Sequence, residues 1–209
     1  MDQLKDSKLD KWGYVIYRCT YADNDAAWER FKTIVHEQTQ EDLDATPELA
    51  NRLEWTFVED RATLDGASIP QLRERFNRWA AKAVVAENPR TQIRTPDCRP
   101  TAVSGRYCCF IHVDEAALQS VVVAAPEQYV NLVDSLWEPM GDDRYHGHGY
   151  DPDDPLNEVL DPIDGCAEEN VGWMRVELGL AFSAYLYVGA GDTTSWYLSY
   201  RRPPEVVWQ

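Results

Sequence analysis

The sequence lacks the features that mark membrane and secreted proteins. It contains no apolar run of the length that a transmembrane helix needs, and its charged start, from Met1 to Asp10, does not resemble a secretory signal. The five cysteines are odd in number and form no C-x-x-C pair, which argues against a disulfide framework. If Met1 is the native start, we expect a soluble protein of the cytoplasm that has no membrane partner.

Familiar catalytic motifs are also missing. The chain has no G-x-S-x-G, no Walker A sequence, no G-x-G-x-x-G after a strand and no H-E-x-x-H. These absences exclude the most easily recognised hydrolases, nucleotide-binding proteins and zincins, and no cofactor is expected. The adjacent Cys108 and Cys109 would point to opposite faces of a predicted strand, so we expect buried thiols there rather than a redox or metal site.

Basic residues are scarce. Lys and Arg number 20 against 36 Asp and Glu, which gives a formal net charge of −16. Acidic residues are dense between Glu138 and Glu169, where Arg144 is the sole basic residue. This charge makes nucleic acid a poor partner and would attract a basic protein or a cationic ligand, although a solvated acidic loop is the simpler interpretation.

The residue patterns predict a single α+β domain over residues 1–209. The segment from Trp12 to Tyr21 is dense in β-branched and aromatic residues and is predicted to be the first and central strand. The sequence Ser68-Ile-Pro-Gln71 has the capping-box pattern of a helix start. Further strands are expected at 53–58, 107–113, 129–136, 171–176, 184–188 and 195–200, and helices at 25–43, 68–86, 114–122 and 178–182.

Three segments are expected to lie outside this regular structure. Residues 1–11 would form a flexible N-terminal tail, residues 88–105 a loop that contains arginine and proline, and residues 138–165 an acidic loop. The whole pattern is typical of an α+β fold with a ferredoxin-like or α+β-barrel-like sheet, antiparallel or mixed. We expect about six or seven strands, with helices packed on one face.

Alternation along the strands predicts which side chains share a face of the sheet. The face beneath the helices is expected to bury Val15, Tyr17, Trp55, Phe57, Ile111 and Val113. The opposite face would then carry a mixed set: Ile16, Arg18, Thr20, Glu54, Thr56, Phe110, His112, Leu132 and Asp134. Because this set combines apolar groups with convergent charges beneath a long loop, it predicts a pocket.

The ionisable members of this set suggest catalytic roles. His112 would be the general acid or base, with Asp134 or Glu54 as its orienting partner. Arg18 would supply the counter-charge for an anionic substrate or a developing oxyanion. A hydrogen-bonded structural histidine at a strand end is the alternative interpretation of His112.

A second candidate site is a metal site at His146 and His148. Two histidines one residue apart can bind one ion in an extended segment, with nearby aspartates as oxygen ligands and Zn or Fe(II) as the ion. A loop with flanking glycines is poorly preorganised, so this site is the less favoured prediction.

Three segments carry a resemblance to known proteins. Gly13-Tyr-Val-Ile-Tyr-Arg-Cys-Thr-Tyr21, Tyr129-Val-Asn-Leu-Val-Asp134 and Gly165-Cys-Ala-Glu-Glu-Asn-Val-Gly-Trp-Met174 resemble a group of uncharacterised filamentous-fungal proteins of about this length. The resemblance covers most of the chain and implies an intracellular fungal protein. The group has no known activity, so no catalytic residue is transferred. In that group the stretch around His146 is a variable insertion, which counts against the metal site.

Three functions remain open from the sequence. The leading hypothesis is a protein that binds a small organic ligand on one sheet face, with His112 serving an isomerase, cyclase or dehydratase reaction. The competing hypothesis is a protein-interaction module whose acidic loop and surface aromatic residues bind a basic protein partner. The third is a homodimer that forms through the sheet face without a ligand.

Overall fold

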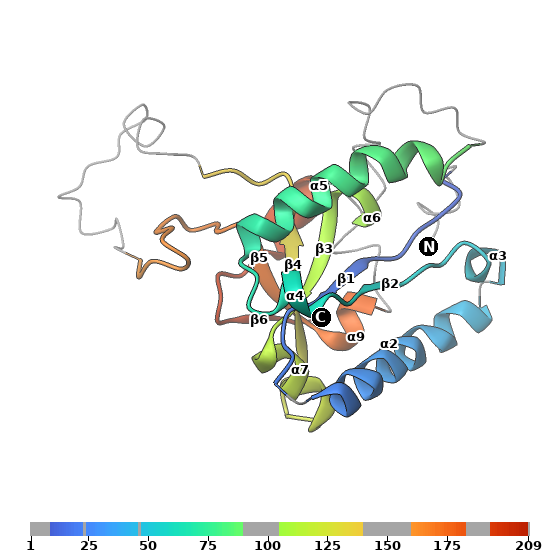
Figure 1. Ribbon diagram of the computed structural model, residues 1–209, viewed down its shortest axis with the longest axis horizontal. Coiled ribbons are helices and arrows are strands. Elements are labelled where there is room, and N and C mark those ends of the chain that lie inside the picture. The colour runs from blue at the N-terminus through green and yellow to red at the C-terminus, as the bar shows by residue number, and fades with distance from the viewer. Residues whose placement is uncertain are drawn as a thin grey trace.

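A mixed β-sheet forms the centre of the computed structural model, which describes residues 9–22, 24–45, 47–89, 105–139, 160–182 and 193–208. Within these ranges the sheet has six strands in the order β2-β1-β3-β4-β5-β6 (Figure 1). The strands are β1 (Val15–Arg18), β2 (Thr56–Val58), β3 (Cys109–Val113), β4 (Tyr129–Asp134), β5 (Trp173–Glu177) and β6 (Val206–Val207).

The directions of the strands divide the sheet into two parts. β1 runs parallel to both of its neighbours, β2 and β3, whereas β4 is antiparallel to β3 and to β5. β6 lies parallel to β5. These pairings confirm an α+β fold with a mixed sheet. The ferredoxin-like motif is a split unit, with a strand between the two parallel strands that one helix connects, but here β1 and β2 are direct neighbours.

Helices cover both faces of the sheet rather than the single face that the sequence predicted. α5 lies over one face, and α2, α7 and α9 lie over the other (Figure 1). No helix in the described ranges is long and apolar enough to cross a membrane. The helices are α2 (Asp25–Ala45), α3 (Pro47–Ala50), α4 (Arg61–Leu64), α5 (Ile69–Ala86), α6 (Gly105–Cys108), α7 (Glu115–Val122), α9 (Leu178–Phe182) and α11 (Thr193–Ser199).

The predicted capping box begins α5. The backbone N–H of Ser68 donates to Oε1 of Gln71 at 2.9 Å, and Pro70 occupies the first turn, where no backbone donor is needed. Leu72 and Phe76 then point to the sheet and are almost fully buried. These local signals confirm the predicted helix.

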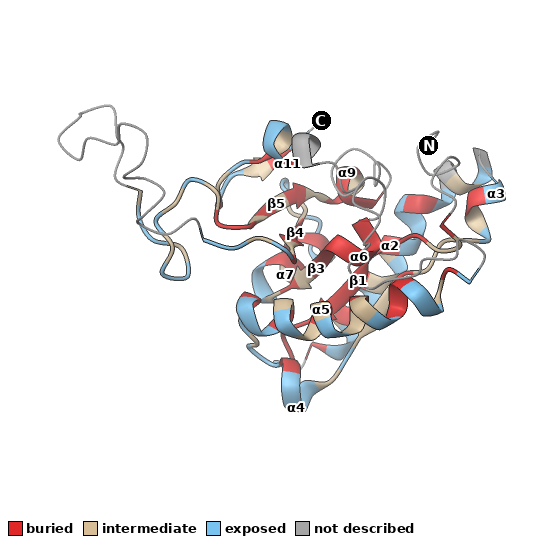
Figure 2. Cartoon of the chain, turned by 90° about the horizontal axis from the view of Figure 1, so that it is seen from above, coloured by how far each residue is buried: buried red, intermediate tan, exposed pale blue. Residues whose placement is uncertain are grey.

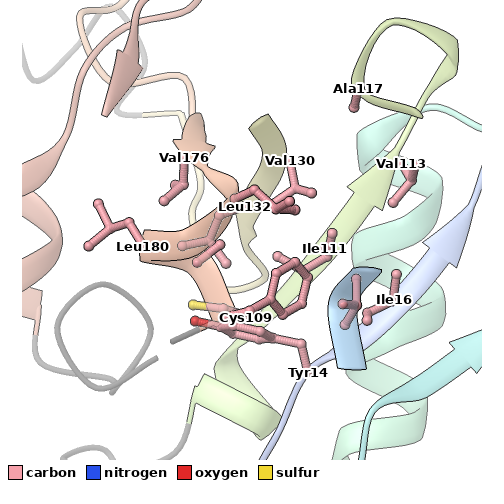
Figure 3. Close-up of a cluster of buried hydrophobic side chains, with 14 of the residues drawn as sticks. Tyr14, Ile16, Cys109, Ile111, Val113, Ala117, Val130, Leu132, Val176 and Leu180 are labelled. Atoms are coloured by element: carbon pink, nitrogen blue, oxygen red, sulfur yellow. The ribbon is translucent and has the colours of Figure 1, made fainter. Parts of the chain in front are cut away.

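Two apolar clusters fill the space between the sheet and the helices. On the face covered by α2, α7 and α9, Ile16, Ile111 and Leu132 lie in register and pack with the neighbouring side chains (Figure 3). On the α5 face, Val15 and Phe110 pack beneath the helix. β1 and β3 are therefore buried on both faces, as the red central strands of Figure 2 show.

The structure differs from the sequence prediction at both ends of the described chain. Leu9, which belongs to the expected flexible tail, is 2% exposed, and its carbonyl accepts a hydrogen bond from Arg52. The predicted strand 195–200 is wrong, because residues 195–199 belong to α11 and Tyr200 directly follows it. Trp196 and Tyr200 are one helical turn apart and both are buried, so the spacing suits a helix. The predicted strand 184–188 lies outside the described residues.

A fully buried arginine, Arg106, connects the C-terminal end of α5 with the segment that precedes β1. Arg106 donates from Nε and Nη2 to the two carboxylate oxygens of Glu87, at 2.7 and 2.9 Å. Its Nη1 donates to the carbonyls of Gly13 and Glu54, and its Nη2 also reaches the Thr56 hydroxyl. One guanidinium thus connects the C-terminal end of α5 with the segments that lead into β1 and β2.

Replacing Arg106 tests how much its hydrogen bonds and ion pairs contribute to stability. We expect Arg106→Met to lower the free energy of unfolding by about 3 kcal/mol, because Glu87 would keep a partly buried charge without its partner. The double variant Arg106→Met/Glu87→Met should lose less than the sum of the two single variants. Urea unfolding measures all three. Arg78→Met, at an exposed ion pair, is the matched control and should change stability by less than about 0.5 kcal/mol.

Candidate functional site

A row of polar side chains crosses four strands on the α5 face of the sheet. Tyr17 of β1 lies opposite His112 of β3, His112 lies opposite Asn131 of β4, and Asn131 lies opposite Arg175 of β5. Residues opposite each other in paired strands point to the same face, so the four side chains are neighbours in space. Tyr17 belongs to the apolar cluster beneath α5, and we call the other three residues, His112 on β3, Asn131 on β4 and Arg175 on β5, the polar row.

Each member of the polar row carries a buried polar atom that lacks a hydrogen-bond partner within the described part of the chain. The atoms are Nδ1 of His112, Oδ1 of Asn131 and Nε of Arg175. Buried polar groups without partners are uncommon in proteins, and each one costs about 1 to 3 kcal/mol. Other buried atoms of the described chain, such as Ser135 Oγ and Trp173 Nε1, share this property, but the three atoms of the polar row are distinguished by their opposed positions on neighbouring strands.

Asn131 is the fixed centre of the row. Its side chain is 1% exposed, and its Nδ2 donates to the His112 carbonyl at 3.1 Å and to Oδ2 of Asp114 at 3.2 Å. Because both contacts of Nδ2 are acceptors, the amide must present its nitrogen to them, and its buried oxygen points away from them. Asp114 is itself held by the first turn of α7, where its Oδ1 accepts from the backbone N–H of Ala117.

The imidazole of His112 is kept in its neutral form. Burial lowers the pKa of His112 below its usual value of 6.5, and the charges of Asp114 and Asp164 only partly oppose that effect. A neutral imidazole offers one donor and one acceptor nitrogen, so it can give or take a proton. The side chain is partly exposed while Nδ1 faces inward.

Arg175 brings a positive charge to the other end of the row. Its guanidinium lies over the Tyr129 ring, with 4.5 Å from Cζ to the ring centroid, and Nη1 donates to the Pro204 carbonyl at 3.2 Å. No carboxylate of the described residues forms an ion pair with it. Glu177, two residues further along β5, instead accepts from the backbone N–H groups of Gly179 and Leu180.

The structure does not bring the four predicted catalytic residues together. Arg18 is paired with Val113, one position beyond His112, so Arg18 and His112 point to opposite faces. Arg18 is buried and donates to Asn24 and Asp25 at 2.8 and 2.6 Å. Its charge is therefore already neutralised on the α2 side of the sheet.

Asp134 and Glu54 also lie away from His112. Asp134 is the last residue of β4, opposite Cys109, and its Oδ1 accepts from the backbone N–H of Leu136. Glu54 precedes β2 and forms ion pairs with Lys11 and Arg106. Burial raises the pKa of the Glu54 carboxyl, but the hydrogen bond from Lys11 and the charge of Arg106 outweigh it, so the net pKa is lowered. The prediction that Arg18 and Asp134 share a sheet face with His112 is wrong. Of the four predicted catalytic residues, His112 alone lies in the polar row.

The predicted metal residues His146 and His148 lie outside the described residues. Within the ranges that the structure describes, no group of three or more His, Cys, Asp or Glu side chains is placed to hold a metal ion. The predicted buried thiols Cys108 and Cys109 are confirmed as buried. Burial raises the pKa of Cys109 well above its usual value and that of Cys19 to about 12, so neither thiol is a ready nucleophile.

The sequence reasoning missed Asn131 and Arg175. Asn131 is a single polar residue inside the strand Tyr-Val-Asn-Leu-Val-Asp, where all four central residues are buried. Arg175 sits in Trp-Met-Arg-Val-Glu, which alternates in burial and places Arg175 on the less buried side. An amide within an otherwise apolar buried strand is the signal that could have identified this face.

Comparison of the chain with protein families, curated proteins and solved structures finds no significant match. The resemblance to filamentous-fungal proteins therefore stays a prediction.

Removal of the His112 imidazole should change how stability depends on pH. Because the folded-state pKa of His112 lies below its unfolded value, lowering the pH below 6.5 protonates the unfolded chain first and reduces the stability. We expect His112→Phe to lose less stability than the wild type between about pH 7.5 and about pH 5.5. At the higher pH it should gain about 1 kcal/mol, because an unpartnered buried nitrogen is removed.

Urea unfolding at both pH values measures this effect. His36→Phe is the matched control, since His36 is exposed on α2 and its ring lies 5.8 Å from Phe57. Identical pH dependence in the wild type and His112→Phe would contradict the assignment of a neutral buried imidazole.

Proposed function

We propose that this protein binds a small polar organic molecule on the α5 face of the sheet, through the polar row. The observation that carries this proposal is the adjacency of three buried atoms that lack partners within the described chain: His112 Nδ1, Asn131 Oδ1 and Arg175 Nε. A bound molecule that supplies the three missing hydrogen bonds would remove a large desolvation cost. The same contacts would orient the molecule beside the His112 imidazole, which is suited to acid or base chemistry.

The topology supports this location. β1, α2 and β2 form one parallel crossover, and α5 then passes over the opposite face to reach β3 on the other side of β1. In open sheets of this kind ligands bind outside the carboxyl ends of the strands, next to the point where the connections diverge. His112 is the penultimate residue of β3 and Asp114 follows its end, so the row lies close to that point. This support is an analogy with a class of folds.

Access to the row requires side-chain movement. The unpartnered nitrogens of His112 and Arg175 face inward, but both side chains are partly exposed. Contact of a ligand with these two nitrogens therefore requires the side chains to rotate. Asn131 stays in place, since its two donated hydrogen bonds fix the amide. Binding therefore consists of adjustment at the two ends of the row around a fixed centre.

The interaction hypothesis receives less support. The acidic segment that would bind a basic partner falls mainly in residues 140–159, outside the described residues. A sheet-to-sheet homodimer would need an open face, whereas helices pack on both faces of this sheet. Small-molecule binding is the function that the described residues favour.

Ligand binding can be tested by NMR with labelled protein. A mixture of small amides, diols, amines and carboxylic acids is added to the wild type, and the ring nitrogens of His112 and the side-chain amide of Asn131 are followed. We expect both groups to shift together when a component of the mixture binds. In His112→Phe the apparent affinity measured from the Asn131 shift should fall about tenfold, which is the effect of losing one hydrogen bond worth about 1.4 kcal/mol.

His36→Phe serves as the control, because it removes a histidine on the other side of the sheet and should leave binding unchanged. The proposal fails if no component shifts the row, or if the shifts persist in His112→Phe with the affinity of the wild type.

A further inference from the structure

We infer that the molecule bound by the polar row is a small hydroxycarboxylic acid, with its carboxylate on Arg175 and its hydroxyl between Asn131 and His112. This inference rests on the proposed binding function and adds the chemical class of the ligand. It follows from the type of atom that each residue offers, from the charge of Arg175 and from the spacing of the strands.

The hydrogen-bonding character of the row is fixed at two of its three positions. Asn131 offers an acceptor, because both donors of its amide are used by the His112 carbonyl and by Asp114. Arg175 offers a donor, since Nε of a guanidinium carries a hydrogen and cannot accept. The ligand must therefore present a donor to the centre of the row and an acceptor to its Arg175 end.

The acceptor at the Arg175 end should carry negative charge. Within the described residues Arg175 contacts a carbonyl and an aromatic ring but forms no ion pair, although acidic residues outnumber basic ones in this chain. A guanidinium favours a carboxylate over a neutral acceptor, because charge-assisted hydrogen bonds are about twice as strong as neutral ones. The carboxylate of the ligand thus takes the place that a side-chain carboxylate takes at other arginines of this protein, such as Glu87 at Arg106.

The donor at the centre of the row is best supplied by a hydroxyl group. A hydroxyl can donate its single hydrogen to Asn131 Oδ1 while its oxygen accepts from Nδ1–H of His112, so the ring is expected to bind in the tautomer that carries its hydrogen on Nδ1. An ammonium group has no acceptor and cannot bond to that tautomer. A hydroxyl is therefore the group that joins an obligate acceptor to an imidazole that donates from Nδ1.

The spacing of the strands sets the size of the ligand. Paired strands lie about 4.8 Å apart, so the partners of the carboxylate and of the hydroxyl are about 5 Å apart and the whole row spans about 10 Å. A carboxylate and a hydroxyl on neighbouring carbons fit between two such partners. A long or bulky ligand is not needed to reach all three residues.

Three small compounds separate these contributions. Lactate carries both groups, propionate carries only the carboxylate, and propylene glycol carries only hydroxyls. Labelled protein is titrated with each compound, and the Arg175 Nε–H, the Asn131 side-chain amide and the His112 ring nitrogens are followed by NMR. We expect lactate to bind about tenfold more tightly than propionate or propylene glycol, with shifts at all three residues.

Variants assign each group of the ligand to its residue. In Arg175→Met we expect lactate and propylene glycol to bind with equal affinity, because the carboxylate has lost its partner. In Arg201→Met, which alters an exposed arginine that bonds only to the Tyr200 carbonyl in the described structure, the preference for lactate should remain. A preference that survives in Arg175→Met would overturn the placement of the carboxylate.

The possible failures are distinct. If propylene glycol shifts Asn131 and His112 as strongly as lactate does, the hydroxycarboxylic acid is overturned while small-molecule binding stands. If none of the three compounds shifts the row but a component of the wider mixture does, the chemical class is again wrong and the binding function stands. If nothing in either experiment shifts the row, both proposals fail.

Discussion

The enclosure of β1 is the constraint on which the rest of the structure depends. All four of its residues are buried, and it has a parallel partner along each edge. A strand enclosed in this way satisfies its backbone only through two ladders, and it requires apolar cover on both faces. The chain meets this requirement by sending α2 and α5 to opposite sides of the sheet. The carboxyl ends of β1 and β3 consequently meet at one edge, where polar side chains can gather without disturbing the core.

Local signals were sufficient to predict most of the elements beside this strand. α5 was predicted from Ser68, Gln71 and the apolar spacing that follows, because a helix start depends on groups only three residues apart. The helix expected at 114–122 is found as α7, and the side chain of Asp114 at its start accepts from the backbone N–H of Ala117. α11 was missed because the segment Ser-Trp-Tyr-Leu-Ser-Tyr is rich in strand-forming aromatic residues. Tertiary contacts decided the matter, since Trp196 within α11 and Tyr200 directly after it are both buried.

The register of the sheet could not be predicted from the same signals, and with it most of the site was lost. β3 has the sequence Cys-Phe-Ile-His-Val, with apolar residues on both of its faces. Alternation therefore does not show which residues lie on which face of the sheet. A change of one residue in the register between two strands turns every side chain to the other face. Arg18 was therefore expected beside His112 and is found on the opposite face. Asn131 carries the missing information, because an amide in a buried strand needs partners and marks the face on which they lie.

The polar row is best understood as a local cost that folding alone does not explain. Three unpartnered buried groups cost about 1 to 3 kcal/mol each, which is a large share of the roughly 5 to 15 kcal/mol that separates a folded domain from its unfolded chain. Apolar side chains at His112 and Arg175 would pack on the same face without that cost, as Val15 and Phe110 do one row away. The fold tolerates the cost of the polar row because its main stabilising interactions lie elsewhere, around Arg106 and in the two apolar clusters. The three atoms lie at opposed positions of neighbouring strands, so one small molecule bound there would satisfy all of them, and this is the basis of the proposed binding function.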